Sequence, residues 1–151
     1  DAVVYHPDGR VKIVLDSQTL REINPDSKRN LGALVLTPEQ YDTMSGEEFK
    51  KDKIGKIGDS LSKKDVKDHP VWRVLARDEA LLNYYADYVF AEGEQRFYCD
   101  TAMGVYLTSA AVSTPEMRAW CVVRLEGRSC VSGRVVLDDG DGRLVGVAPE
   151  A

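Results

Sequence analysis

Three aspartates near the C-terminal end have the residue type and spacing that metal binding requires. Asp138, Asp139 and Asp141 lie within the segment VVLDDGDGRLV (135–145). A calcium loop of the EF-hand type needs acidic residues at positions 1, 3 and 5 and a glutamate at position 12. With Asp141 at position 5, leucine and alanine occupy positions 1 and 12. The sequence therefore favours a β-hairpin turn, which Asp-Gly pairs between apolar runs typify. A divalent-ion site completed by a distant carboxylate is the alternative.

A thiol and an imidazole form a second candidate pair. Cys99 lies at the edge of an expected strand or loop, and His69 directly precedes Pro70. Cysteine and histidine act as nucleophile and base when the fold brings them together. Helix capping or a surface position is the more ordinary explanation of His69. The sequence contains no Cys-x-x-Cys, His-x-x-x-His, Gly-x-Ser-x-Gly or phosphate-loop pattern.

Asp78 is the carboxylate with the most unusual expected position. It falls among leucines on the apolar stripe of a helix expected over residues 69–92. Because charged residues are rarely buried without a partner, Arg77 or Arg124 is expected to pair with it, unless it lies at the wet edge of the stripe. The functional alternative is a general acid or base with a raised pKa in a pocket beside the helix.

Tyrosines concentrate in the same part of the chain. Tyr84 and Tyr88 are four residues apart and turned partly away from the apolar stripe, and Tyr98 follows. Tyrosine suits interfaces because its ring is apolar while its hydroxyl stays in water. This cluster predicts a self-association face or a ligand groove.

Two helices are expected to position these groups. The long helix over 69–92 has apolar residues at steps of three, four and seven, a proline in its first turn and Gly93 after its end. A shorter helix is expected over 115–126, where a Thr-Pro-Glu sequence resembles a helix start. A strand across 120–125 is the alternative, since valines favour strands.

The remaining elements are mostly strands. Hairpins are expected over 3–15 and 130–147, a buried strand over 31–37, and one or two strands within 96–110. Thr37 should cap a helix, and 45–52 should begin another short one. The charged segment 50–68 is expected to be loop with short helical pieces, and mobile. This order predicts one α+β domain over 1–151, with a mostly antiparallel sheet packed against the long central helix.

Composition narrows the functional class. The 151 residues are 43% hydrophobic and 30% charged, as in a soluble globule. No apolar run approaches the ~20 residues of a membrane span, and no signal peptide is expected. Three cysteines without a repeating spacing indicate a reducing cytoplasm. The net charge of −5 argues against nucleic-acid binding, although seven of the nine lysines lie between Lys50 and Lys67 and form a candidate anion-binding surface.

Together these observations predict a non-catalytic cytoplasmic binding or regulatory module that forms a homodimer and needs no cofactor. The alternative is a small hydrolase that uses Asp78 and the 138–141 carboxylates, with or without a divalent metal.

Overall fold

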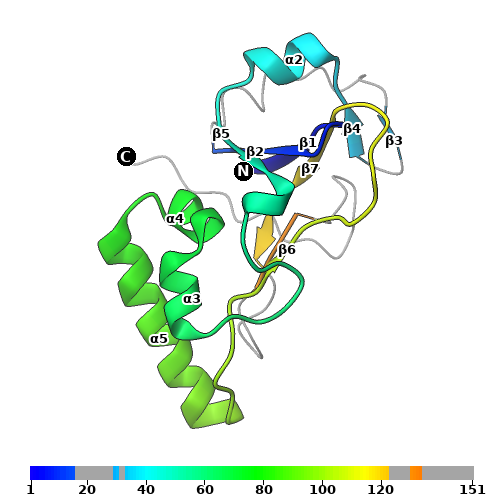
Figure 1. The fold of residues 1–151 in the computed structure, drawn as a ribbon. Coiled ribbons are helices and arrows are strands. Elements are labelled where there is room, and N and C mark those ends of the chain that lie inside the picture. Colours follow the sequence, from blue (N-terminus) through cyan, green and yellow to red (C-terminus); the bar gives the residue numbers. More distant parts are fainter. Residues whose placement is uncertain (16–28, 31–32, 123–129, 134–151) are drawn as a thin grey trace.

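The computed structural model describes residues 1–15, 29–30, 33–122 and 130–133 (Figure 1). The chain begins with the expected hairpin, made by β1 (Ala2–Tyr5) and β2 (Arg10–Val14). Gly9 adopts a φ of 86°, which glycine reaches without steric cost, and its N–H donates to the His6 carbonyl across the turn. The hairpin prediction is therefore confirmed.

This hairpin lies within the main sheet. Within the described residues the strand order is β3-β4-β7-β1-β2-β5, and every neighbouring pair is antiparallel. The other strands are β3 (Arg29–Asn30), β4 (Ala33–Val35), β5 (Glu47–Lys50) and β7 (Glu116–Ala119). A smaller sheet contains β6 (Val105–Tyr106), β9 (Val131–Ser132) and β8 (Cys121–Val122), in that order. The expected α+β class with a mostly antiparallel sheet is confirmed.

Strand β7 corrects the prediction of a helix over 115–126. Glu116–Ala119 pairs with β1 on one side and with β4 on the other, and β8 follows directly. Because β7 is central and three of its four residues are buried, it lacks the alternation of a half-buried strand. Long-range strand pairing thus overrides the local helix-start signal of Thr-Pro-Glu. Residues 121–122, the described part of the alternative strand over 120–125, do form a strand.

Strand β5 corrects a second expected helix, over 45–52. Glu47–Lys50 pairs with β2, and a 3₁₀ helix, η1 (Lys51–Lys53), follows. A side chain at Gly46 would place its Cβ 2.5 Å from the Ile13 carbonyl oxygen of β2. Glycine at position 46 therefore lets the chain pass close to β2. Strand β5 forms there in place of the expected helix.

The long helix expected over 69–92 is two helices, α4 (Pro70–Ala76) and α5 (Glu79–Phe97). Arg77 turns into the left-handed region at φ 60°, and Asp78 then caps α5. Gly93 does not end α5. Its carbonyl accepts the N–H groups of Tyr98 and Cys99, and the helix ends at Phe97, five residues after the expected end.

Two shorter helices complete the fold. The expected Thr37 cap begins α2 (Pro38–Thr43), with a reciprocal capping box between Thr37 and Gln40. The expected helical pieces within 50–68 are η1 and α3 (Lys63–Asp68), and this segment buries Ile54, Leu61 and Val66. None of the helices in the described residues is both long and apolar enough to cross a membrane.

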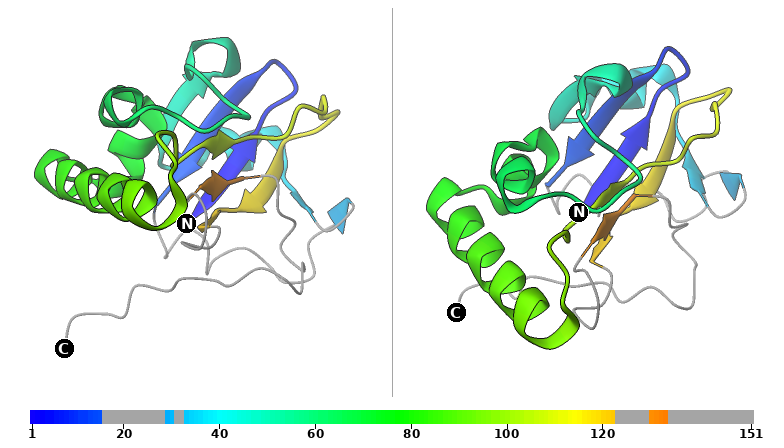
Figure 2. Two further views of the ribbon diagram at one scale, coloured as in Figure 1. Left: turned by 90° about the horizontal axis from the view of Figure 1, so that it is seen from below. Right: turned by 60° about the horizontal axis from the view of Figure 1, so that its bottom comes forward.

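The core occupies both faces of the main sheet. Val3 and Tyr5 of β1 pack in one cluster with residues of α3, α4 and α5, whereas Ala2 and Val4 pack in the other with Tyr41 and Met44. Helices α3 to α5 therefore lie on one side of the sheet and α2 lies at the other (Figures 1 and 2). Helix α5 lies at the margin of the molecule in both views of Figure 2.

Candidate functional site

Helix α5 carries apolar side chains on two opposite faces. Its inner face enters the core through Leu82, Ala86, Val89, Phe90 and Gly93. On the outer face, Leu81, Tyr84 and Tyr88 are 56%, 72% and 51% exposed. These three residues follow a spacing of three and four, so they form one stripe along the helix. We call Leu81, Tyr84 and Tyr88 the outer stripe.

Neighbouring elements hold the outer stripe in place. The Asp78 carboxylate accepts the Leu81 N–H at 2.7 Å and so caps the first turn of α5. On the side facing α3, the Asp87 carboxylate lies 2.9 Å from Lys63 and 2.8 Å from Lys67. Tyr85 turns inward, and its ring lies 6.4 Å from that of Trp72. Tyr84 and Tyr88 therefore project from a helix whose inner side is fixed.

The third predicted tyrosine lies beyond the helix. Tyr98 adopts left-handed backbone angles and is 93% exposed. It borders an open hollow of about 620 Å³. The hollow is lined by Lys63, Asp87, Phe90, Ala91, Glu94, Tyr98, Cys99 and Asp100. The hollow adjoins the outer-stripe side of α5 at Ala91, which is exposed.

No hydrogen bond joins Cys99 and His69, the predicted thiol–imidazole pair. The His69 ring is 4% exposed and caps α4, where Nδ1 accepts the Val71 N–H at 3.3 Å. Its Nε2 lies 3.0 Å from the Lys56 carbonyl. Burial lowers the pKa of His69, so the ring is neutral at pH 7. The half-buried Cys99 thiol donates to the Phe97 carbonyl at 3.3 Å. Both side chains are thus engaged by backbone groups.

Asp78 does not lie on a buried stripe, which corrects the expected position. It is exposed and precedes α5, because the helix break at Arg77 turns it outward to cap the next helix. Its expected partner Arg77 donates instead to the Leu15 carbonyl at 2.7 Å. Arg124 and the carboxylates of Asp138, Asp139 and Asp141 lie outside the described residues.

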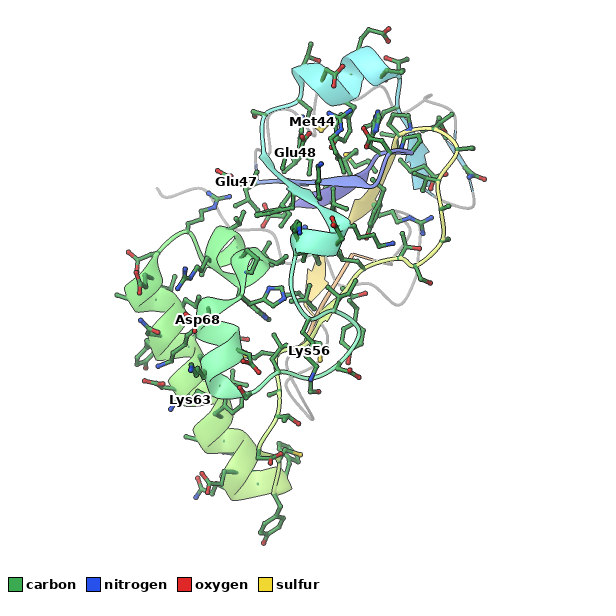
Figure 3. The ribbon with its side chains drawn as sticks, viewed as in Figure 1. Met44, Glu47, Glu48, Lys56, Lys63 and Asp68 are labelled. Atoms are coloured by element: carbon green, nitrogen blue, oxygen red, sulfur yellow. The ribbon has the colours of Figure 1, made fainter. Side chains whose placement is uncertain are left out.

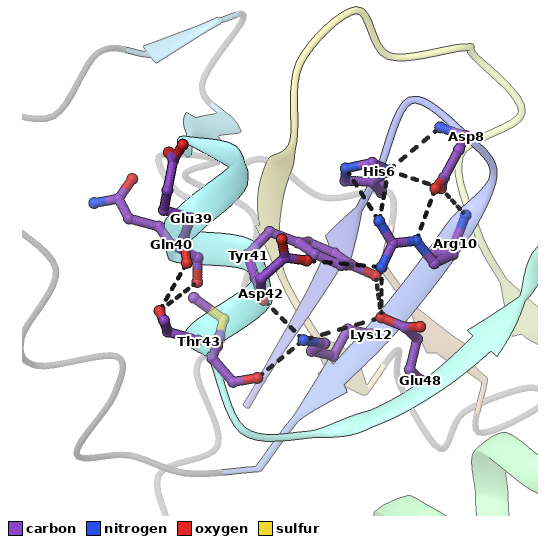
Figure 4. A network of polar contacts seen from close by, with 11 residues as sticks. His6, Asp8, Arg10, Lys12, Glu39, Gln40, Tyr41, Asp42, Thr43 and Glu48 are labelled. Atoms are coloured by element: carbon purple, nitrogen blue, oxygen red, sulfur yellow. Dashed lines mark hydrogen bonds and ion pairs between the residues drawn. The ribbon is translucent and has the colours of Figure 1, made fainter.

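A polar network around Tyr41 was not anticipated from the sequence (Figure 4). The Tyr41 hydroxyl donates to Glu48 Oε2 at 3.0 Å, and Arg10 Nη1 lies 3.4 Å from the same oxygen. The His6 ring contacts the Tyr41 ring, with centroids 4.7 Å apart. Lys12, only 7% exposed, donates to the carbonyl oxygens of Tyr41 and Met44. A charged residue between Val11 and Ile13 in a buried strand was the available signal.

This network fastens α2 to the sheet rather than activating a reactive group. Burial, and then the hydrogen bond to Glu48, raise the pKa of the Tyr41 hydroxyl far above its usual value of 10. Tyr41 is therefore a neutral hydrogen-bond donor at any physiological pH, not a nucleophile or base. Lys12 satisfies carbonyls at the C-terminal end of α2, where the helix leaves such groups unpaired.

The expected lysine surface is interrupted by acidic residues. A second hollow, of about 560 Å³, is lined by Lys63, Lys64, Lys67, Asp68, Arg73, Glu79 and Asn83. Figure 3 shows Lys63 and Asp68 at the two ends of α3. Arg73 pairs with Asp68 at 3.1 Å, and Lys63 and Lys67 share Asp87. These pairs reduce the positive field available to an anion.

Within the described ranges, no group of three or more histidine, cysteine, aspartate or glutamate side chains is arranged to hold a metal ion. Comparison of the whole chain with family models, curated proteins and solved structures found no match.

Proposed function

We propose that the protein is a non-catalytic binding module that self-associates as a homodimer through the outer face of α5. The observation that carries this proposal is that α5 is apolar on both faces while the core covers only one of them. A helix that stays in solution alone normally turns a polar face to water. The outer face of α5 instead exposes three large apolar or aromatic side chains along one stripe, namely Leu81, Tyr84 and Tyr88.

The size of the stripe supports an interaction role. An aromatic side chain has about 150–250 Å² of surface, so the exposed fractions correspond to roughly 350 Å² on one copy. Patches of this size on soluble proteins are often functional. Tyrosine adds a polar hydroxyl, which makes the face tolerable in water before a partner binds. Tyr98 extends the exposed aromatic surface beyond the C-terminal end of α5.

We also propose that the module works in the cytoplasm. The Cys99 thiol forms no disulfide within the described part of the chain. Structural cysteines of oxidising compartments are commonly paired, whereas free thiols persist where glutathione and thioredoxin keep them reduced.

Light scattering coupled to size exclusion tests the proposal over a wide range of protein concentration. We expect the wild-type protein to give the mass of two chains, and the Tyr84→Ser/Tyr88→Ser variant to give the mass of one. Tyr98→Ser should weaken association less, because Tyr98 lies outside the stripe.

Phe97→Ser is the matched control. Phe97 is 42% exposed but lies nine residues after Tyr88, which is two and a half helical turns and so the opposite side of α5. This variant should stay dimeric. A wild-type monomer at the highest concentration, or a dimer that survives the double tyrosine substitution, would exclude the outer stripe as the interface.

A further inference from the structure

We infer that the two copies pair through antiparallel α5 helices, with Tyr84 of one copy packed against Tyr88 of the other and Leu81 packed against Ala91. This inference rests on the proposed self-association and names its geometry. The antiparallel geometry specifies which residues of the two copies meet at the interface, whereas self-association alone does not.

The spacing along the outer face is symmetric. Leu81, Tyr84, Tyr88 and the exposed Ala91 follow steps of three, four and three residues. Reversing the direction of the helix maps this pattern onto itself. A closed two-fold dimer requires a surface that is complementary to itself, and the antiparallel arrangement supplies one. It also places a large side chain over a small one in the outer layers, as close packing requires. Parallel helices would oppose alanine to alanine and leave a gap.

The charges of α5 favour the same direction. Glu94 and Asp100 border the hollow at the C-terminal end, and neither forms an ion pair within the described part of the chain. Parallel pairing would bring two copies of these carboxylates together and would align two helix dipoles side by side. In this register, antiparallel pairing separates the two Glu94 residues by about 24 Å along the axis, because each lies eight residues from the midpoint at residue 86. It also brings Arg77, which is 61% exposed and lies 3.8 Å from Asp1 of its own chain, toward the partner's acidic end.

The available area fits a dimer that dissociates on dilution. The outer stripe contributes about 700 Å² from both copies together, from the exposed fractions and typical side-chain areas. The exposed neighbours Ala80 and Ala91 add to this area, which remains below the roughly 1,200 Å² at which stable interfaces begin.

Cysteine cross-linking tests the direction and the register. In the antiparallel pair, position 81 faces position 91 of the other copy, whereas two copies of position 81 lie about 15 Å apart along the axis. A disulfide requires Cα atoms within about 7 Å. In a Cys99→Ser background, we expect a mixture of Leu81→Cys and Ala91→Cys chains to form a cross-linked dimer under mild oxidation. Each variant alone should not. Mass spectrometry identifies the linked peptides, which separates them from any link through Cys121 or Cys130.

A spin-label distance provides a second measurement that leaves the outer stripe intact. Labels at Gln95→Cys, in the Cys99→Ser background, should lie about 27 Å apart along the helix axes in the antiparallel dimer, and side by side in a parallel one. The labelled Cys99→Ser protein alone supplies the background signal. Cross-linking of either single variant, or a short label distance, would overturn the antiparallel geometry. If light scattering shows a dimer but the mixture of Leu81→Cys and Ala91→Cys chains does not cross-link and the labels do not lie about 27 Å apart, this inference fails while self-association stands. A monomer refutes both.

Discussion

The ε-ammonium group of Lys12 lies 4.4 Å from the centre of the Tyr41 ring and donates a 2.7 Å hydrogen bond to the Tyr41 carbonyl oxygen. Lys12 belongs to β2 and Tyr41 to α2, so one buried cation joins a strand to a helix. The same ammonium group donates a second hydrogen bond, of 3.0 Å, to the carbonyl oxygen of Met44, the residue that follows α2. The charge is thus matched by carbonyl dipoles, by the face of an aromatic ring and by the Glu48 carboxylate, whose Oε2 lies 4.0 Å from the ammonium nitrogen.

Replacing this cation should destabilise the protein. Lys12→Met keeps the apolar stem but leaves two carbonyl oxygens without their charged donor, so we expect a loss of about 1.5–3 kcal/mol. Urea unfolding at pH 7 measures the change. Lys64→Met is the control, because Lys64 is exposed and the change there should stay within about 0.5 kcal/mol. Equal stability of the two variants would mean that the buried ammonium does not hold α2.

Asp78 offers a test that separates a structural role from a chemical one. As the cap of α5 it should tolerate Asp78→Asn, because asparagine caps helices as well as aspartate does. Asp78→Ala should lower the free energy of unfolding by about 1 kcal/mol, measured by urea denaturation. A general acid or base would show the reverse sensitivity. Any hydrolytic activity that vanishes in Asp78→Asn while stability is retained would favour the carboxylate-hydrolase alternative.

The elements that could be predicted from sequence are those specified by local chemistry. The Asp8-Gly9 turn between valine-rich segments defines the first hairpin, and the Thr37-Pro38 start defines α2. The exposed position of Tyr84 and Tyr88 follows from helical geometry once the helix is assigned.

The predictions that were wrong concern elements whose structure depends on residues distant in the sequence. Residues 116–119 form a strand because β1, near the N-terminus, pairs with one of their edges and β4 pairs with the other. The break between α4 and α5 had a local signal in Asp78 followed by Glu79, but the apolar periodicity runs across it. The partners of Lys12 are carbonyl groups of α2, which no sequence spacing reveals.

Divalent ions should leave the stability of the protein unchanged. The sequence around Asp138, Asp139 and Asp141 predicts a hairpin turn that lacks two calcium ligands. We therefore expect the same thermal midpoint in chelator and in millimolar calcium or magnesium, because only a ligand that prefers the folded state raises it. A rise that disappears in Asp139→Asn/Asp141→Asn would instead locate an ion on this segment.

His69 should make stability depend on pH. Desolvation by burial lowers its folded-state pKa below 6.5, although the Lys56 carbonyl and Asp65 act in the opposite direction. The unfolded chain therefore binds a proton at a higher pH than the folded protein does. The stabilisation is fully present above pH 6.5, and it is lost as the pH falls through 6.5 toward the lowered pKa. Protonation also removes the Nδ1 lone pair that accepts the Val71 N–H.

His69→Asn isolates this contribution, because asparagine caps the helix without titrating near neutral pH. Urea unfolding of both proteins at pH 8, 7, 6 and 5 gives the difference in free energy at each pH, in which His6 and the carboxylates common to both proteins cancel. We expect wild type to be the more stable at pH 8, because asparagine does not reproduce the bond to the Lys56 carbonyl, and the difference to shrink below pH 6.5. A difference that stays constant from pH 8 to pH 5 would show that His69 takes up its proton equally readily in the folded and unfolded states.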